Sequence, residues 1–343
     1  MTRGGGDPDT PLRAAEFAAA FAGLVSAKCI LAAVSGGPDS TALMGGFASW
    51  GRVPVRVATV DHRLRTGSQT EAENVAAAAV ALGLRHAVLT WTGENNGNVS
   101  QEAARNARYG LLEAHARAIG ASHLVTAHTL DDQAETLMLR LAAGSGLSGL
   151  AGMRRETARD ELIHARPFLF LPKSRLVATC RERGWPFVED PSNADPRFGR
   201  VRWRGLMPRL AAEGLGSARL ARLAARLARA DEALDRTASE TFSRVAGRED
   251  ATFELDMAAL AREPEEVALR VLKLALDGDR AGPPPRRAIR LQRLEDCLAA
   301  LLEAVRSGHP TRRTLAGRVL HVRSDGVLRI ALEAPRARGR TER

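Results

Sequence analysis

The chain has 343 residues, enough for about two or three domains, and 45% of them are hydrophobic, so a sizeable core can form. No run of about 18 apolar residues occurs, and the first residues lack the apolar segment of a secretory signal, so a membrane protein is not expected. Three scattered cysteines, Cys29, Cys180 and Cys297, exclude a disulfide framework and a paired-cysteine metal site, and we expect a cytoplasmic protein.

The net charge is +10 at pH 7 and the sequence pI is about 10.8. This sign favours a nucleic-acid partner, because phosphates dominate nucleic-acid surfaces. Nearly all the basic residues are arginines in a chain rich in Ala and Gly, so a biased composition explains the charge equally well. The distribution of the arginines along the chain therefore matters more than their number.

Strand-like and helical patterns alternate in the first part of the chain. The expected strands are 30–33, 53–60, 85–91 and 123–127, and the expected helices are 12–27, 41–50, 71–82, 100–120 and 131–143. This alternation predicts an α/β fold with a doubly wound parallel sheet and helices on both faces. In such sheets ligands bind at the carboxyl ends of the strands.

The later part of the chain has a different pattern. The run 163–171 predicts a last or edge strand, and leucines on one helical face from residue 217 predict a helical linker and a small, mostly helical domain. Apolar runs at 314–323 and 327–330 flank an Asp-Gly turn and predict a terminal β-hairpin. The expected parts are a disordered N-terminus (1–11), a catalytic domain (12–212), the linker with a C-terminal domain that contacts the nucleic acid (213–333) and a disordered basic tail (334–343).

The motif Val34-Ser35-Gly36-Gly37-Pro38-Asp39-Ser40 directly follows the first strand and precedes a helix. Paired glycines allow a tight turn and a close approach of the backbone to a ligand. Free amides at the following helix N-terminus attract an anion, and the serine hydroxyls add donors. We therefore expect a cradle for phosphate or pyrophosphate rather than an ordinary glycine-containing turn. A Walker A loop is excluded because no lysine follows the last glycine.

Two groups of polar residues further along the chain are weaker indications of a binding site. The residues after the second strand include Asp61, His62 and Arg65, which either cap the next element or line the crevice beside the cradle. In the following long helix, Arg105 and Arg108 share a face with Gln101. A solvated surface helix produces the same pattern, so these residues do not indicate a site by themselves.

The densest polar cluster follows the fourth strand. His128 comes directly after the strand, and Asp131, Asp132 and Glu135 open the next helix. One carboxylate at a helix N-terminus is ordinary capping, but three carboxylates beside a histidine exceed what capping requires. Such a cluster suits Mg²⁺ or a cationic amine.

A basic stretch follows an acidic turn at 189–195. Between Arg197 and Arg229 the chain has nine arginines and one acid, Glu213. Arginine forks fit phosphates, and the interleaved Phe198 and Trp203 are able to stack on bases. A purely structural basic helix is the alternative.

Taken in this order, these blocks resemble the tRNA(Ile)-lysidine synthetases, a family of PP-loop ATP pyrophosphatases. The matching blocks are residues 35–40, 60–65, 101–109, 126–136 and 189–193. The resemblance covers roughly residues 29–210 and is weak beyond them. A PP-loop alone would be unspecific, whereas the ordered set identifies the family.

The resemblance implies ligation in two steps. ATP adenylates the C2 oxygen of the wobble cytidine (position 34) of a tRNA(Ile) with a CAU anticodon, and pyrophosphate leaves. The ε-amine of L-lysine then displaces AMP to give lysidine, so that AUA is decoded as isoleucine. The implied cofactors are ATP and Mg²⁺, and the implied partners are this tRNA and L-lysine, with a homodimer left open.

Residue roles follow from the same resemblance. Asp39, His128 and Asp132 are expected to be catalytic, with both aspartates as metal ligands and His128 as the group that removes a proton from the incoming amine. Lysine is expected at Asp131, Asp132 and Glu135. The expected nucleotide contacts are Ser35, Gly36, Gly37, Pro38, Asp39, Ser40, Asp61, His62 and Arg105. The expected tRNA contacts are Arg65, Arg108, Arg197, Arg200, Arg202 and Arg204.

One departure and three alternatives accompany this interpretation. Thr129 stands where the family pattern has a second histidine, and the C-terminal part is short for the longer members. A tRNA thiolase of the same fold needs a pair of cysteines for sulfur or an iron–sulfur cluster. A small-molecule ATP-dependent ligase explains the PP-loop but not the arginine stretch, and an inactive RNA-binding module explains the charge but not the acids.

Overall fold

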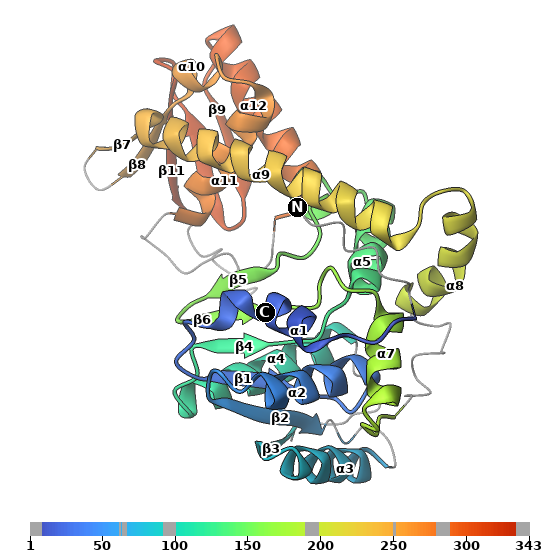
Figure 1. Ribbon diagram of the computed structural model, residues 1–343. Helices are drawn as coiled ribbons and strands as arrows, with labels where there is room; N and C mark the ends of the chain where they lie inside the picture. The colour runs from blue at the N-terminus through green and yellow to red at the C-terminus, as the bar shows by residue number, and fades with distance from the viewer. Residues whose placement is uncertain are drawn as a thin grey trace, which may run out of the picture. The chain divides into compact units, whose positions relative to one another are not determined.

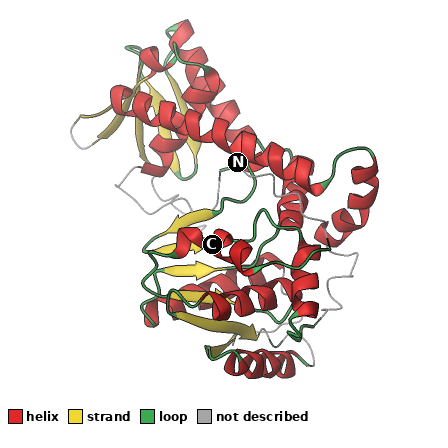
Figure 2. Cartoon of the chain, in the orientation of Figure 1, coloured by secondary structure: helices red, strands yellow, loops and turns green. Residues whose placement is uncertain are grey.

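The computed structural model describes residues 9–61, 63, 67–91, 101–188, 199–249, 252–278 and 289–333. The chain forms two compact units, which Figures 1 and 2 show as ribbons. The first unit comprises Met1–Gly144 with Gly149–Ala225, and the second comprises Ser145–Ser148 with Arg226–Arg343. Each unit has its own sheet and its own core.

The first unit contains a six-stranded sheet in the order β3-β2-β1-β4-β6-β5 (Figure 1). Its strands are β1 (Ile30–Ala33), β2 (Val55–Asp61), β3 (Arg85–Thr90), β4 (His123–Val125), β5 (Glu156–Arg159) and β6 (Leu162–Ala165). All neighbouring pairs are parallel except β5 with β6. The expected parallel α/β sheet is therefore confirmed.

The helices that precede the second sheet in the chain are α1 (Ala14–Ala20), the 3-10 turn η1 (Ala22–Leu24), α2 (Pro38–Trp50), α3 (Ser68–Ala81), α4 (Gln101–Ala118), α5 (Leu130–Ala142), α6 (Leu147–Leu150), α7 (Lys173–Glu182), α8 (Gly199–Ala212) and α9 (Ser217–Val245). Both faces of the first sheet carry helices from this group. Ile30 and Ala32 pack with α1, α2, α3 and α7 on one face, whereas Leu31 packs with α4 on the other. This alternation along β1 shows why the strand is apolar at every position: both of its faces are buried.

Aromatic side chains join α1 to the sheet. Phe21 is fully buried, and its ring stacks on Phe47 with the centroids 4.3 Å apart and lies 5.8 Å from Phe168. Phe21→Ala is expected to lower the free energy of unfolding by about 3–5 kcal/mol, because the change leaves a cavity in a packed core. Urea denaturation measures this loss, with the exposed Val25→Ala as control. A loss below about 1 kcal/mol would show that the core closes around the cavity.

The order in which successive strands are added to the sheet changes sides at β1. From β1 it proceeds to β2 and β3 on one side, and it then returns to place β4 on the other side of β1. The residues that follow β1 and β4 therefore emerge side by side at the carboxyl edge of the sheet. Crevices at such reversal points are where open α/β sheets bind ligands.

The second unit is built on a five-stranded antiparallel sheet in the order β7-β8-β11-β10-β9. Its elements are β7 (Ala246–Glu249), β8 (Thr252–Asp256), α10 (Met257–Leu260), α11 (Glu265–Gly278), α12 (Leu291–Ser307), β9 (Thr311–Leu315), β10 (Arg318–Val322) and β11 (Val327–Leu332). Leucines of α11 and α12 share a core with one face of this sheet, as the apolar residues Leu320 and Leu328 show.

The second unit contains the expected helices and the expected hairpin, but it has more strands than the sequence indicates. β10 and β11 pair around the Asp-Gly turn, whereas Thr314 and Leu315 belong to the separate strand β9. Ala316 and Gly317 both have positive φ angles, 55° and 75°, and form the tight turn between β9 and β10. Turns with positive φ angles usually contain Gly, Asn or Asp, so the alanine makes this turn difficult to predict from the sequence.

The strand expected at 163–171 is also shorter than predicted. β6 ends at Ala165, and the apolar residues that follow it form a turn around Pro167. Proline cannot donate a ladder hydrogen bond, so it ends the strand. Phe168 and Leu169 are nevertheless fully buried, which accounts for the apolar run.

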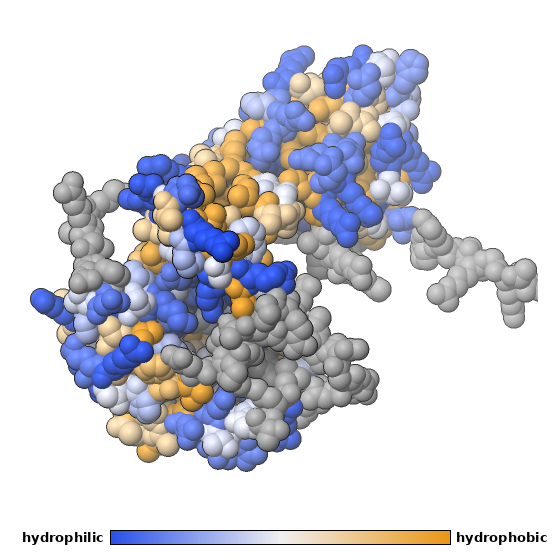
Figure 3. Space-filling view, turned by 90° about the vertical axis from the view of Figure 1, so that its right-hand side faces the viewer, coloured by the Kyte–Doolittle hydropathy of each residue, from blue (hydrophilic) through white to orange (hydrophobic). Residues whose placement is uncertain are grey.

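The surface mixes hydrophilic and apolar side chains, as the face in Figure 3 shows. Exposed large apolar residues among the described positions include Val80, Phe170 and Leu215. Single apolar side chains at a surface are normal and do not indicate a partner by themselves. Within the described ranges, none of the helices combines the length and the apolar character of a bilayer span.

Candidate active site

The PP-loop begins where β1 ends. Gly36 has a φ of +85°, and a Cβ placed there would lie 3.1 Å from Val75 Cγ2, so both the conformation and the space favour glycine. Gly37 is the N-cap of α2, and Pro38 takes the first helical position, where a missing N–H costs nothing. The backbone N–H of Val188 donates to the Gly36 carbonyl at 2.9 Å, which ties the segment after α7 to the loop.

Two serine hydroxyls lie at the mouth of this loop. The Ser35 N–H donates to Ser40 Oγ at 3.2 Å, the two Oγ atoms are 3.3 Å apart, and Ser40 Oγ donates to the Gly37 carbonyl at 3.0 Å. The two hydroxyls therefore lie together beside the N-terminus of α2. This arrangement suits an anion such as a phosphate.

Asp39 lies in the first turn of α2 and has one oxygen paired and one unpaired. Its Oδ2 is 3.2 Å from Lys173 Nζ, whereas its Oδ1 is buried without a hydrogen-bond partner among the residues that the structure describes. Burial raises the pKa of Asp39 to about 6; the Lys173 ammonium opposes this shift, and the Asp132 and Asp131 carboxylates add to it. The three aspartates, which belong to two different helices, therefore lie close enough to influence one another.

Lys173 is a site residue that the sequence pattern did not reveal. It opens α7 and reaches Asp39 from a position far along the chain. The available signal was composition: only three lysines, Lys28, Lys173 and Lys273, occur among 50 basic residues. A lysine kept in so arginine-rich a chain suggests that a compact ammonium is needed there.

Asp131 and Asp132 each hold local structure. Asp131 accepts hydrogen bonds from the Lys173 N–H at 2.8 Å and from Ser217 Oγ at 3.1 Å, so it joins α5 to α7 and α9. Asp132 Oδ2 accepts from the N–H and the hydroxyl of Thr129, at 2.9 and 3.0 Å. Thr129 in turn accepts from the Asp132 N–H, which completes a capping box. The threonine that replaces the family's second histidine thus starts helix α5.

Glu135 is paired rather than open. Its side chain is 3% exposed, and the Arg204 guanidinium donates to both of its oxygens, at 2.7 and 3.2 Å. This bidentate pair joins α8 to α5. Arg204, expected among the tRNA contacts, is therefore paired within the chain, although its side chain is 41% exposed. On the same helix, Arg200 is partly buried and Arg202 is exposed.

A group of arginines lies on the α4 side of the site. The guanidinium carbons of Arg105, Arg108 and Arg159 lie 5.1, 5.3 and 5.3 Å from the centre of the Tyr109 ring. The Tyr109 hydroxyl is buried without a hydrogen-bond partner in the described part of the chain. Several positive charges thus gather around one aromatic ring, which makes this side of the site suitable for a phosphate-bearing ligand.

His128, which follows β4, lies within the influence of these arginines. Thr126 Oγ1 is 2.8 Å from its Nδ1. Burial, together with the charges of Arg166, Arg105 and Arg108, lowers the pKa of His128 well below its usual range. The imidazole is therefore neutral at physiological pH.

Asp61 has a local structural contact, and several other expected site residues lie outside the part of the chain that the structure describes. Asp61 is 5% exposed and accepts from the Arg63 N–H at 2.9 Å, as a residue that caps the end of β2 does. His62, Arg65, Arg197, the acidic block 189–193, residues 1–8 and the tail 334–343 lie outside the described residues.

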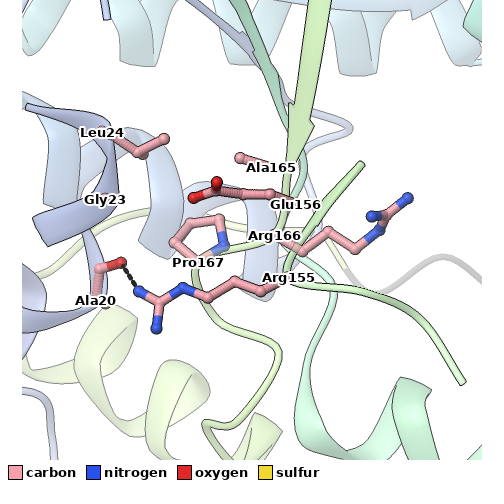
Figure 4. A pocket seen from close by; sticks show the side chains of 8 residues that line it. All are labelled: Ala20, Gly23, Leu24, Arg155, Glu156, Ala165, Arg166 and Pro167. Carbon is pink, nitrogen blue, oxygen red and sulfur yellow. Dashed lines mark hydrogen bonds between the residues drawn. The ribbon is translucent and has the colours of Figure 1, made fainter. Parts of the chain in front are cut away.

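An open pocket of about 980 Å³ adjoins the acids. Its charged and polar lining includes Asp131, Glu135, Lys173, Arg181, Arg204 and Ser217. A second, smaller crevice, shown in Figure 4, is lined by residues such as Gly23, Glu156 and Pro167 and has no space for a water molecule. There the Arg155 guanidinium donates to the Ala20 carbonyl, so this crevice is a packing feature.

The residues of the site fit a magnesium ion that is held together with phosphates. No group of three or more His, Cys, Asp or Glu side chains placed to hold a metal occurs within the described ranges. Mg²⁺ usually binds one or two carboxylates plus substrate phosphates and keeps several waters. The unpartnered Asp39 Oδ1, beside the phosphate cradle, is an oxygen of this kind.

The cysteines do not form a sulfur-transfer site. Cys180 is fully buried beneath the PP-loop, where its Sγ donates to the Pro38 carbonyl at 3.3 Å. Burial raises the pKa of this thiol to about 12. Cys297 is buried in the second unit, and Cys29 is only partly buried. None of the three is paired with another cysteine.

Comparison with known proteins agrees with this geometry. A family described as a PP-loop domain matches residues 11–210. The chain is 54% identical over 313 residues to the tRNA(Ile)-lysidine synthase of Methylobacterium sp. (strain 4-46), which covers 90% of each chain. It is 52% identical over 336 residues to that of Methylobacterium nodulans, which covers 96% of this chain and 98% of the relative.

Among solved structures, the U34-tRNA thiolase NcsA of Methanococcus maripaludis has a TM-score of 0.54 and covers 63% of this chain and 78% of its own. Its sequence identity is 14%, so this likeness supports the PP-loop fold and nothing finer. Because a PP-loop domain family matches residues 11–210, and because two tRNA(Ile)-lysidine synthases share about half of their residues with this chain over about nine-tenths of both lengths, the chain belongs to the tRNA(Ile)-lysidine synthase family.

Proposed function

We propose that this chain is an ATP-dependent carbon–nitrogen ligase that joins L-lysine to C2 of the wobble cytidine (position 34) of a tRNA(Ile) with a CAU anticodon. The products are lysidine, AMP and pyrophosphate, and AUA is then read as isoleucine. The observation that carries the proposal is the 54% identity to a tRNA(Ile)-lysidine synthase over 90% of both chains. A tRNA substrate also implies that the enzyme works in the cytoplasm.

The phosphates of ATP are proposed to bind at the PP-loop. The amides at Gly36, Gly37 and the start of α2 and the hydroxyls of Ser35 and Ser40 surround the place where the charge of departing pyrophosphate develops. Asp39, with Asp132 nearby, is proposed to hold Mg²⁺, which when bound would neutralise phosphate charge. Pro38 keeps the first turn of α2 in place.

L-lysine is proposed to bind in the open pocket. The pocket carries both acids, Asp131 and Glu135, and cations, Lys173, Arg181 and Arg204. An amino acid with two ammonium groups and one carboxylate needs partners of both signs. The volume of about 980 Å³ also exceeds what so small a ligand occupies, which leaves room for the cytidine.

The tRNA is proposed to approach along the arginines of α4 and α8. Arg105 and Arg108 lie together beside Tyr109, and Arg200 and Arg202 are on α8. Arg105 is close enough to the site for a nucleotide phosphate as well. Binding through such contacts is expected to weaken strongly as salt rises, because counterions are released.

Lys173 is proposed to assist the adenylation step. Lys173→Met removes the ammonium that lies 3.2 Å from Asp39 Oδ2, so phosphate charge loses a nearby counter-charge. We expect kcat/KM for ATP to fall about 100-fold. Pyrophosphate exchange measures the effect, with the exposed Lys28→Met as the matched control. Equal rates in both variants would remove Lys173 from the mechanism.

The proposed function is tested by incubating the enzyme with ATP, radiolabelled lysine and a tRNA(Ile) transcript that carries CAU. Lysine incorporation that needs ATP and the wobble cytidine is the expected result. ATP cleavage without incorporation would overturn the lysidine assignment and favour a thiolase or a small-molecule ligase instead. The buried Cys180 thiol, with its raised pKa, already disfavours the thiolase. A homodimer is a further proposal, which light scattering of the purified protein tests.

A further inference from the structure

A chain of hydrogen bonds runs through the first unit from Arg166 to His128. Arg166 Nη2 lies 2.9 Å from His164 Nδ1, His164 Nε2 lies 2.9 Å from Thr126 Oγ1, and Thr126 Oγ1 lies 2.8 Å from His128 Nδ1. Arg166, His164 and Thr126 are 7%, 1% and 6% exposed, so water does not compete for these bonds. Figure 4 shows the Arg166 side chain extending away from the small crevice that its backbone lines.

The direction of each bond is set by Arg166. A guanidinium only donates, so His164 Nδ1 must be an acceptor and the single proton of a neutral ring must be on Nε2. His164 is neutral, because burial and the adjacent Arg166 lower its pKa to about 2. Its Nε2–H therefore donates to Thr126 Oγ1.

The same reasoning extends to the active site. Thr126 Oγ1 accepts from His164, and a hydroxyl oxygen is able to accept a second hydrogen bond as well. Among the described residues, however, the single hydroxyl proton of Thr126 has no acceptor within hydrogen-bond distance other than His128 Nδ1, which assigns that proton to His128 Nδ1. His128 Nδ1 then accepts, and the proton of this neutral ring is on Nε2. In the described part of the chain, His128 Nε2 has no hydrogen-bond partner, so this N–H is free to meet a ligand.

We propose that Arg166, acting through His164 and Thr126, holds His128 in its Nε2–H tautomer, so that His128 donates a hydrogen bond to an anionic oxygen of the substrates. Arg166, His164 and Thr126 are positioning residues, and His128 makes the contact. The charges around the ring, from Arg105, Arg108 and Arg200, make an anion the acceptor that fits. That oxygen comes either from the nucleotide or from the RNA.

This inference rests on the proposed function only for the identity of the ligand. It replaces the role of proton acceptor that the sequence suggests for His128. Nδ1 is occupied by the Thr126 hydroxyl, and Nε2 carries the proton, so no lone pair faces the site. A neutral ring with a strongly lowered pKa is in any case a weak base.

NMR of the protein labelled with ¹⁵N-histidine measures the tautomer directly. The chain has eight histidines, so the His128 signals must be assigned. In the ligand-free enzyme at pH 7.5, His128 is expected to show a protonated Nε2 and an unprotonated Nδ1, with the assignment taken from H128Q. A proton on Nδ1 would overturn the proposal. This measurement needs no turnover, so it stands even if lysine incorporation fails.

The relay is tested at Thr126. Thr126→Val keeps the shape but removes the hydroxyl, so His128 is expected to show a mixture of tautomers and turnover is expected to fall about tenfold. Thr126→Ser restores the hydroxyl and is expected to restore both the single tautomer and most of the turnover. An unchanged His128 spectrum in a folded T126V protein would exclude the relay.

The donor role is tested by paired substitutions of His128. The amide of glutamine is able to donate from nearly the same place, whereas alanine is not. His128→Ala is expected to lower kcat about 100-fold or more, and His128→Gln is expected to retain at least about ten times the activity of H128A. Equal activities would overturn the donor role.

The source of the acceptor oxygen is distinguished by the response of the His128 Nε2–H resonance. A non-hydrolysable ATP analogue that shifts it identifies a nucleotide phosphate, and an RNA stem-loop with CAU that shifts it identifies the RNA. If neither ligand changes the resonance at saturating concentration, His128 does not contact a substrate and the proposal falls.

Discussion

Asp39→Asn is expected to make the ligand-free protein more stable at pH 7.5 and at the same time inactive. The carboxyl has a pKa of about 6 in the folded protein and an ordinary value of 3.8, so the folded state binds its proton more tightly than the unfolded state does. The stability that the neutral form provides is complete below pH 3.8 and is lost as the pH rises through 6. At pH 7.5 the ionised carboxylate thus costs up to about 3 kcal/mol.

Asparagine keeps the shape and cannot ionise, so this cost disappears. Thermal unfolding with EDTA is expected to show D39N above the wild type at pH 7.5 and equal to it near pH 4. Asp160→Asn is the control, because the Asp160 side chain is 83% exposed. A D39N protein that is less stable at pH 7.5 would mean that the pair with Lys173 outweighs the cost of burial.

The activity of D39N tests whether catalysis needs the ionised carboxylate that lowers the stability. We expect pyrophosphate exchange to fall at least about 100-fold, because the amide is a poor ligand for Mg²⁺ and carries no charge. Together, a gain in stability and a loss of turnover would identify Asp39 as a residue kept for function at the expense of stability. Retained turnover would assign the metal to another acid, with Asp132 the first candidate.

Breaking the pair between Glu135 and Arg204 is the second large effect that we expect. Arg204→Met leaves a carboxylate that is 3% exposed without its bidentate partner, and the free energy of unfolding is expected to fall by about 2–4 kcal/mol. Glu135→Gln is expected to cost less, because a neutral amide tolerates burial better. Urea denaturation measures both, with the exposed Arg209→Met on the same helix as control.

The double variant separates structure from function. E135Q/R204M contains no unpaired charge and is expected to recover most of the lost stability, so the two substitutions should be strongly non-additive. If Glu135 also holds lysine, the KM for lysine stays raised in E135Q and in the double variant despite the recovered stability. A normal KM in both would leave Glu135 as the anchor of α8 alone.

Much of the first unit was predictable from the sequence because its signals are local. The strand–loop–helix unit around Gly36 and Gly37 depends on backbone freedom, a buried apolar run and a helix start, all within a few residues. The apolar runs of β1 and β2 and the helical periods between them have the same local origin. The family motifs are local in the same way, so the resemblance to the family follows from the order of the residues.

Other features depend on contacts between residues that are far apart in the sequence, so the sequence alone did not reveal them. Lys173 reaches Asp39 from another helix, and the Arg166–His164–Thr126–His128 relay joins the end of β6 to the loop that follows β4. Glu135 is paired because α8 returns to α5, and the Ala316–Gly317 turn creates a strand where the sequence continues without a break.

The physical reason is the difference between local and long-range interactions. Residue type and spacing determine which segments become helices, strands and turns, and therefore which residues are available at the carboxyl edge of the sheet. They do not determine which charges end as partners, because a pKa or a tautomer depends on neighbours that only packing provides. The sequence by itself thus determined the fold class, the family and the strand–loop–helix unit around Gly36 and Gly37, and the tertiary structure decided which oxygens and protons the site presents.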